Sequence, residues 1–174
     1  SLQTTSTQVN PLSLRLTYRI SKIPFQPETV NSVKRAYGID IGEGQVYGVF
    51  VSFRTREGWT GLHRMIYDTG AVVSLLPLRF YNMLGVQKYA PIKLTGIAPE
   101  VEVKARLTRV RLRLEDIEGN LSPEIETWVA IAERDDVPRV IGLKDIANTH
   151  RLTVDPKEQR FYLDFCQKRF LLLF

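Results

Sequence analysis

The stretch that decides the fold reads Ile66-Tyr67-Asp68-Thr69-Gly70-Ala71-Val72-Val73-Ser74-Leu75-Leu76-Pro77. It places an Asp-Thr-Gly tripeptide between an apolar strand and a second apolar run. An ionisable residue within hydrophobic sequence is costly to bury and is usually retained for chemistry. The tripeptide alone is a weak signal, because short motifs recur by chance and because Asp and Gly also favour plain surface turns. Its apolar flanks give it weight.

The segments around this stretch alternate in the manner of strands. Residues 46–53 and 62–67 alternate on either side of a Glu57-Gly58 turn and predict a hairpin that leads into Asp68. After it, Pro77 and Gly85 bracket a short helix at 78–84. A further strand is expected at 14–20, and Pro24 and Pro27 prevent it from continuing. Other strands are expected at 125–131, 151–154 and 160–165. The predicted fold class is therefore all-β, with one or two short helices.

Two more segments complete a recognisable order. Leu94-Thr95-Gly96-Ile97-Ala98-Pro99-Glu100 follows the helix, and Val140-Ile141-Gly142-Leu143-Lys144-Asp145-Ile146 precedes the last strands. Over residues 44–165 the chain has, in order, a hairpin, the Asp-Thr-Gly loop, a flap (a hairpin that would fold over a substrate) and a second apolar-Gly segment. This order resembles the retropepsin-like aspartic proteases, whose chains carry one such motif and pair as homodimers. The resemblance implies a retropepsin-like acid protease barrel, with the active site on the two-fold axis of the dimer.

The resemblance also implies roles for single residues. Asp68 would be the catalytic acid of an aspartic endopeptidase, acting on a polypeptide substrate together with Asp68 of a second subunit. Thr69 would bridge to the opposite loop, Gly70 would permit close backbone approach, and Ala71 would leave room for the substrate. No cofactor and no metal ion is implied.

Thr95, Gly96, Ile97 and Ala98 would form the flap that folds over the substrate. The alternative to a flap role for Gly96 is a glycine in an ordinary hairpin bend. The alternative for Gly142, in the second apolar-Gly segment, is a glycine in an ordinary strand.

Retroviral enzymes often pair an acid just after the Asp-Thr-Gly-Ala run with an arginine just after the second glycine. Here Val72 and Leu143 occupy those places, which is closer to cellular and prokaryotic relatives.

The length of 174 residues accommodates one domain with a sizeable core, and only one Asp-Thr-Gly occurs. The second carboxylate must therefore come from another chain. We divide the chain into an N-terminal extension at 1–43, partly disordered and with one strand, and a protease-like domain at 44–174. The apolar run 170–174 is expected either to be a dimerisation strand or to be buried in its own subunit.

Bulk composition excludes some classes of protein. No apolar run is long enough for a membrane span, and the single Cys166 fits a reducing compartment, so we expect a cytoplasmic location. The net charge is +5, and basic residues concentrate between Lys104 and Arg113. They alternate with apolar residues, which favours a solvated sheet face over a nucleic-acid site. The alternation slips at Thr108-Arg109, which predicts a β-bulge there.

Two other functions stay open at this point: a non-catalytic dimerisation or peptide-binding module, and, less favoured, a nucleic-acid-binding β domain. Ser74 resembles a nucleophile, but His63 and His150 lack a triad context. Asp135-Asp136 lacks the spacing of a metal site and is typical of a turn.

Overall fold

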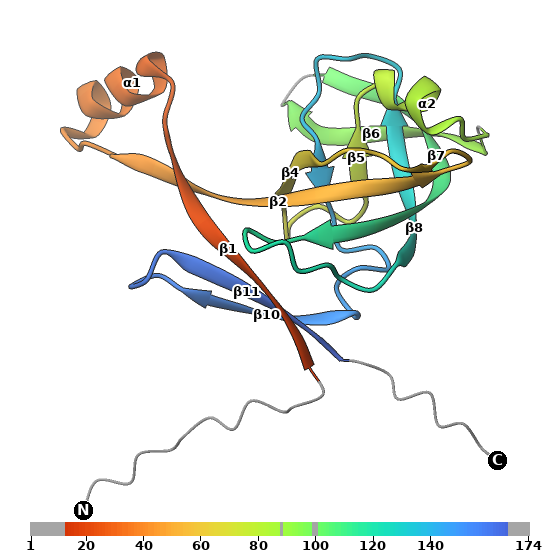
Figure 1. Cartoon of the computed structure of the whole chain (residues 1–174). Coiled ribbons are helices and arrows are strands. Elements are labelled where there is room, and N and C mark those ends of the chain that lie inside the picture. The colour runs from red at the N-terminus through yellow and green to blue at the C-terminus, as the bar shows by residue number, and fades with distance from the viewer. Residues whose placement is uncertain (1–12, 88, 99–100, 167–174) are drawn as a thin grey trace, which may run out of the picture.

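The computed structural model describes residues 13–87, 89–98 and 101–166. Within them the chain forms one continuous hydrogen-bonded sheet and two short helices (Figure 1). This confirms the mostly β prediction. In chain order the elements are β1 (Ser13–Pro24), α1 (Pro27–Tyr37), β2 (Glu43–Thr55), β3 (Gly58–Trp59), β4 (His63–Tyr67), β5 (Ser74–Leu76), α2 (Arg79–Leu84), β6 (Ala90–Ala98), β7 (Val101–Glu115), β8 (Ile125–Ala132), β9 (Val140–Ile141), β10 (His150–Asp155) and β11 (Arg160–Cys166).

Part of the sheet closes on itself. Hydrogen bonding runs from β2 through β4, β9, β5, β8 and β7 and back to β2, so these strands form a barrel. The closure depends on β2, whose residues 48–51 pair with β4 while 50–53 pair with β7. The predicted hairpin leading into Asp68 is thus a wall of the barrel.

β1, β10 and β11 extend away from the barrel (Figure 1). β1 pairs with β11 along its first half and with β2 along its second, and β10 pairs with β11. Leu16, Tyr18 and Ile20 of β1 are buried, and the Tyr18 ring stacks on Phe161 with the ring centroids 5.1 Å apart. The β1 strand of the predicted extension therefore belongs to the same sheet and the same core.

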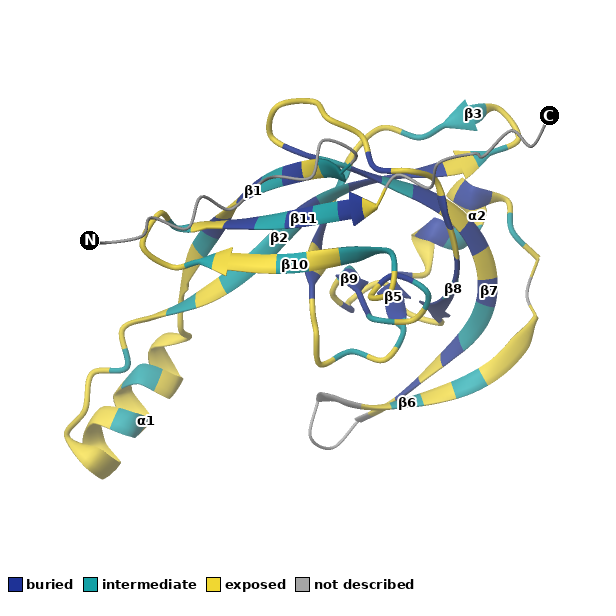
Figure 2. Ribbon diagram, turned by 90° about the horizontal axis from the view of Figure 1, so that it is seen from below, coloured by how far each residue is buried: buried dark blue, intermediate teal, exposed yellow. Residues whose placement is uncertain are grey.

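α1 begins at Pro27, as expected where a proline follows a strand, and it stands apart at the end of the β1–β2 ribbon (Figures 1 and 2). None of its residues is buried. α2 matches the predicted helix: it ends at Leu84, and Gly85 closes it in the left-handed conformation at φ 59°. No helix in the described ranges combines the length and the apolar character that crossing a membrane requires.

The β-bulge predicted at Thr108-Arg109 is wrong. β7 and β8 keep one register from Ala105 opposite Ala132 to Leu112 opposite Ile125. The pattern slips because β7 exchanges its buried face: Val103 and Ala105 pack in one apolar cluster, whereas Val110 and Leu112 pack in the main core. The strand runs between two cores, so the phase of burial changes without an inserted residue (Figure 2).

Candidate active site

The Asp-Thr-Gly loop connects β4 to β5, and β9 lies between these two strands. β9 pairs in parallel with β4, where Ile66 faces Val140, and antiparallel with β5, where Leu75 faces Val140. A segment from late in the chain is thereby inserted directly behind the loop. This is the place that the resemblance implied for the second apolar-Gly segment.

Backbone hydrogen bonds fasten the loop to this segment. The Asp68 N–H donates to the Ile141 carbonyl at 3.0 Å. Further along, the Leu143 N–H donates to the Ala71 carbonyl at 2.9 Å, and the next N–H in the chain donates to the Val72 carbonyl at 2.8 Å. Each end of the loop is therefore held by main-chain groups, whose positions do not depend on side-chain rotamers.

Gly142 is required by this packing. A Cβ atom at position 142 would lie 2.5 Å from the carbonyl carbon of Val73 and 2.8 Å from the Ala71 oxygen. The alternative of a plain strand glycine is wrong. The Gly142 N–H donates to the Ser74 hydroxyl at 3.0 Å, and Ser74 is fully buried. Ser74 thus supports the loop and is not accessible as a nucleophile.

Asp68 stands at an open surface. Its side chain is exposed, and its Oδ1 accepts the Gly70 N–H at 2.8 Å, so the loop itself orients the carboxylate. Thr69 and Gly70 are also exposed, and Val72 is 79% exposed. The Thr69 hydroxyl makes no hydrogen bond to any described residue. The described residues of the chain therefore leave the outer face of the loop uncovered.

A cavity of about 510 Å³ extends from Asp68 along the inner side of β6. It brings together the predicted residues Asp68, Gly70, Ala71 and Thr95, and its far wall includes Val140. Thr69 instead borders a neighbouring hollow of about 460 Å³, whose lining includes Tyr47 of β2 and Leu152 of β10. Asp68 lines both.

The predicted flap corresponds to the β6–β7 hairpin. Gly96, Ile97 and Ala98 lie in β6, and Ala98 pairs with Val101 of β7. The side chains of 96–98 and all of 99–100 lie outside the described residues. Of the four predicted flap residues, Thr95 alone is placed against the cavity by a described side chain. The apolar run 170–174 also lies outside the described residues.

A hydrogen-bonded chain beside Asp68 was missed by sequence reasoning. The Thr149 hydroxyl donates to the Ile146 carbonyl at 2.6 Å, so it must accept from His150 Nδ1 at 3.0 Å. His150 Nε2 is then free to accept the Tyr67 hydroxyl proton, at 2.8 Å. Burial lowers the pKa of His150 and raises the pKa of Tyr67, and the neutral forms are those that this network needs. The partners are too far apart in sequence to form a local motif.

Other candidates from the sequence have structural roles. Asp135 Oδ1 accepts the N–H of Arg79 at 2.8 Å at the start of α2, and Asp136 pairs with Arg134. His63 packs its ring against Phe80, at 5.0 Å between centroids. Among the described residues, no three His, Cys, Asp or Glu side chains come together as a metal site would require.

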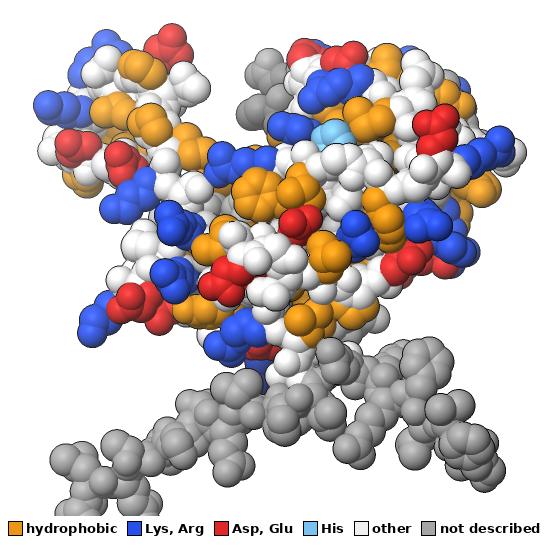
Figure 3. Space-filling view, viewed as in Figure 1, with side chains coloured by type: hydrophobic (Ala, Val, Ile, Leu, Met, Phe, Trp, Pro, Cys, Tyr) orange, Lys and Arg blue, Asp and Glu red, His pale blue; other side chains and the backbone are white. Residues whose placement is uncertain are grey.

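Three arginines of the basic face of β7, Arg106, Arg109 and Arg111, pair with glutamates on β8 and its flanks. Arg109 Nε lies 2.9 Å from Glu126, and Arg106 Nε lies 3.4 Å from Glu133. On the face shown in Figure 3, basic and acidic side chains are interspersed. Paired charges of this kind attract a polyanion weakly, which disfavours the nucleic-acid alternative.

Similarity to known proteins is found among solved structures. No protein-family model matches the sequence, and no curated protein is significantly similar to it. Among solved structures, a retropepsin-like aspartic protease from Rickettsia conorii is similar at 12% identity, covering 83% of this chain and 98% of its own, with a TM-score of 0.44. The EIAV protease, solved with the inhibitor HBY-793, is similar at 21% identity, covering 56% of this chain and 81% of its own, with a TM-score of 0.37. The structural matches are to retropepsin-like aspartic proteases, while identity and TM-score are low, so the function proposed next rests on the residues of this chain.

Proposed function

We propose that this protein is an aspartic endopeptidase whose reaction centre is completed by two copies of Asp68, one from each subunit of a homodimer. The observation that carries the proposal is the exposed Asp68 carboxylate, which lines a cavity of about 510 Å³ and is oriented by a loop that β9 fastens from behind. Among the described residues that line the two hollows beside it, Asp68 is the only acid. A partner for it must come from a second molecule.

The chemistry follows from two carboxylates held close together. Like charges in a partly desolvated site repel, so one apparent pKa rises, the other falls, and the pair holds one proton. The ionised carboxylate draws a proton from a water molecule, while the protonated one hydrogen-bonds the substrate carbonyl. The water then attacks the peptide carbon, without a covalent enzyme intermediate.

The uncovered loop supports pairing across a two-fold axis. The Thr69 hydroxyl makes no hydrogen bond to the described residues of its own chain, and Val72 is 79% exposed. Polar and apolar groups of this kind are satisfied when the same surface of a second copy meets them. In that arrangement the two Asp68 side chains approach one another, and the cavities under the two β6–β7 hairpins join into one cleft for an extended peptide.

Asp68→Asn tests the mechanism, because it keeps the size and hydrogen bonding of the side chain but cannot ionise. We expect peptide hydrolysis between pH 4 and 7 to fall by about 10³-fold or more. Sedimentation should still show a dimer. The matched control is Asp40→Asn, an exposed acid in the connection between α1 and β2, which should leave the rate unchanged. Full activity in Asp68→Asn would remove the mechanism, and an intact native dimer that cleaves no peptide of a broad library would favour the non-catalytic module.

A further inference from the structure

The hydrogen-bonded chain through His150 begins at the residue that directly precedes Asp68. Tyr67 is the last residue of β4 and is buried in the main core, whereas Asp68 is exposed. Consecutive residues of a strand face opposite sides, so the end of β4 carries a buried ring next to the proposed catalytic acid. The Tyr67 hydroxyl donates to His150 Nε2 at 2.8 Å, and the two rings meet edge to face with their centroids 5.8 Å apart. One hydrogen bond therefore links the entry of the loop to β10.

The same chain returns to the other end of the loop. The Thr149 hydroxyl, which accepts from His150, donates to the Ile146 carbonyl at 2.6 Å. The Ile146 N–H in turn donates to the Leu143 carbonyl at 3.1 Å, and the Leu143 N–H donates to the Ala71 carbonyl. Hydrogen bonds thus join both ends of the Asp-Thr-Gly loop through the side chain of His150.

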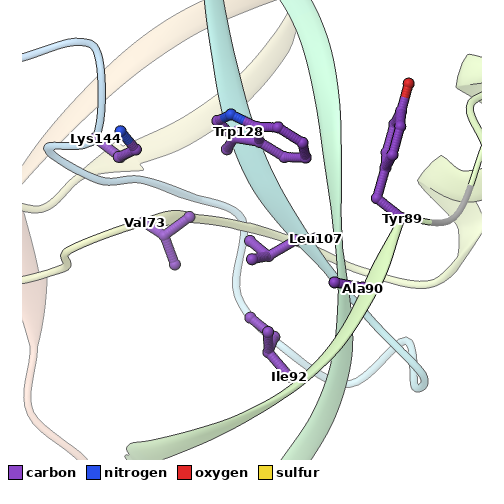
Figure 4. A pocket seen from close by; sticks show the side chains of 7 residues that line it. All are labelled: Val73, Tyr89, Ala90, Ile92, Leu107, Trp128 and Lys144. Carbon is purple, nitrogen blue, oxygen red and sulfur yellow. The ribbon is translucent and has the colours of Figure 1, made fainter.

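The imidazole lies behind the loop and away from the cavities beside it. Neither His150 nor Thr149 lines the two hollows that Asp68 lines, or the apolar cavity of about 520 Å³ whose lining includes Trp128 (Figure 4). The His150 ring packs instead against Phe165 of β11, at 4.9 Å between centroids. A substitution at position 150 therefore removes no contact to a peptide in these cavities.

The hydrogen-bonded path needs a neutral imidazole. The groups that face His150 are the Tyr67 hydroxyl from β4, the Thr149 hydroxyl from the turn before β10 and the Phe165 ring from β11, and none of them is charged at neutral pH. A protonated imidazole donates from both nitrogens, so it cannot accept the Tyr67 proton. Burial lowers the pKa of His150 below its ordinary value of about 6.5, so the protonated form arises only on the acid side of that value.

We propose that His150, acting through Tyr67, is a positioning residue that holds the Asp68 loop in its reactive geometry, and that a proton on His150 releases this hold. A misplacement of about 1 Å at a reacting group costs up to ~10²-fold in rate, and Tyr67 is the covalent neighbour of Asp68. The inference rests on the proposed function for the catalytic role of Asp68, while the coupling of His150 to the loop can be measured without catalysis.

The first test follows the loop by NMR in Asp68→Asn protein, whose loop has no titrating side chain. The Gly70 N–H, which donates to the side chain at position 68, reports the geometry of the loop. The imidazole signal that is lost in His150→Gln identifies His150. Between about pH 8 and pH 4.5 we expect the Gly70 signal to move with the same midpoint as His150. Adding His150→Gln should abolish this movement, because the glutamine oxygen accepts the Tyr67 proton but does not titrate.

The second test measures peptide hydrolysis after single hydroxyl groups are removed. We expect Tyr67→Phe to lower kcat about tenfold and to change KM by less than about twofold, because the loop is displaced while the cavities keep their lining. The matched control is Tyr18→Phe, since the Tyr18 hydroxyl donates to the Glu115 carbonyl at 2.7 Å in the same core. Tyr18→Phe should keep the native kcat.

The pH profile separates positioning from core stability. Native kcat should fall as the pH drops through the midpoint that NMR gives for His150. His150→Gln should keep kcat near the native value at pH 7 and should remain active at lower pH than the native protein. A variant that affected only core stability would leave the pH profile of the folded enzyme unchanged.

The outcomes distinguish this inference from the proposed function. A Gly70 signal that does not follow the protonation of His150, or equal losses of kcat in Tyr67→Phe and Tyr18→Phe, overturns the positioning role and leaves the endopeptidase intact. A loop that follows His150, in a native protein that cleaves no peptide, supports the coupling and overturns the endopeptidase. The comparison of midpoints within Asp68→Asn protein changes neither Tyr67 nor His150, so it decides the coupling even where variants at those positions do not fold.

Discussion

At the scale of single residues, the site depends on a glycine, which has no side chain, as much as on the side chain of Asp68. Gly142 lies where the backbone of the β9 segment passes within contact of Val73 and Ala71, and its own N–H reaches the Ser74 hydroxyl. Only a residue without a Cβ allows this approach. The orientation of Asp68 is therefore set partly by a glycine 74 positions later in the chain.

Gly142→Ala should destabilise the protein and displace the Asp68 loop, because the new methyl group meets backbone atoms that cannot rotate away. Overpacking of this kind costs about 1–3 kcal/mol of the free energy of unfolding. Urea unfolding measures it, with Gly61→Ala as the control, since a Cβ at position 61 meets nothing within 4 Å. Equal stability of the two variants would show that the close approach has no energetic weight.

At the scale of elements, one buried carboxylate joins the barrel to the outer sheet. Asp116, just after β7, accepts the Thr17 N–H of β1 at 2.9 Å and also the N–H groups of Glu118 and Asn120 at 2.9 and 2.8 Å. Burial alone would raise its pKa, but these hydrogen bonds and one from the Asn120 side chain outweigh burial and hold the pKa of Asp116 below its ordinary value. The turn after β7 is thereby tied to β1.

Asp116→Ala should lower the free energy of unfolding at pH 7 by about 2–3 kcal/mol, because it leaves buried N–H groups without an acceptor. A depressed carboxylate pKa means that the unfolded state binds the proton more readily. The contribution of Asp116 is therefore fully present above the unfolded pKa of about 3.9 and is lost as the pH falls through the folded pKa.

Denaturant titrations at pH 7 and at pH 2.5–4 check this dependence. The gap between native and Asp116→Ala should shrink toward the acid end. Asp40→Ala, which removes an exposed acid that accepts only the Gly42 N–H among the described groups, should show a small and pH-independent effect. A gap for Asp116→Ala that stays constant with pH would contradict the assigned protonation state.

At the scale of the whole molecule, each subunit of the proposed homodimer would supply half of the active site. Asp68 and Thr69 face outward, and among the described residues the hollows beside them contain no second acid. The activity of a native subunit should then depend on whether its partner subunit also has an acid at position 68. This property distinguishes a shared reaction centre from one that each chain completes alone.

Mixing native protein with a threefold excess of Asp68→Asn subunits, followed by time for exchange, should lower the activity per native subunit about fourfold, because mixed dimers lack one carboxylate. The readout is the rate of hydrolysis of one peptide at constant native concentration. Asp40→Asn subunits, which keep the acid at 68, should add activity instead. An unchanged rate with Asp68→Asn subunits would mean that a single chain is sufficient.

The sequence by itself determined the elements and their order. Alternation predicts strands because side chains on a strand point to opposite faces, and Pro77 and Gly85 locate α2 because each has a strong backbone preference. The Asp-Thr-Gly loop and the segment around Gly142 were identified from short sequence motifs that resemble those of a known family. These are local properties, and local pattern is sufficient for them.

Tertiary structure decided what depends on long-range contact. β7 changes its buried face at Thr108 because it passes between two apolar cores. When the sequence is interpreted as one half-buried strand, the same change of face predicts a β-bulge. The Tyr67–His150 hydrogen bond and the contact between the Tyr89 and Trp128 rings bring together residues far apart in the chain. Such contacts are set by how the sheet closes into a barrel, and no periodicity in the sequence encodes them.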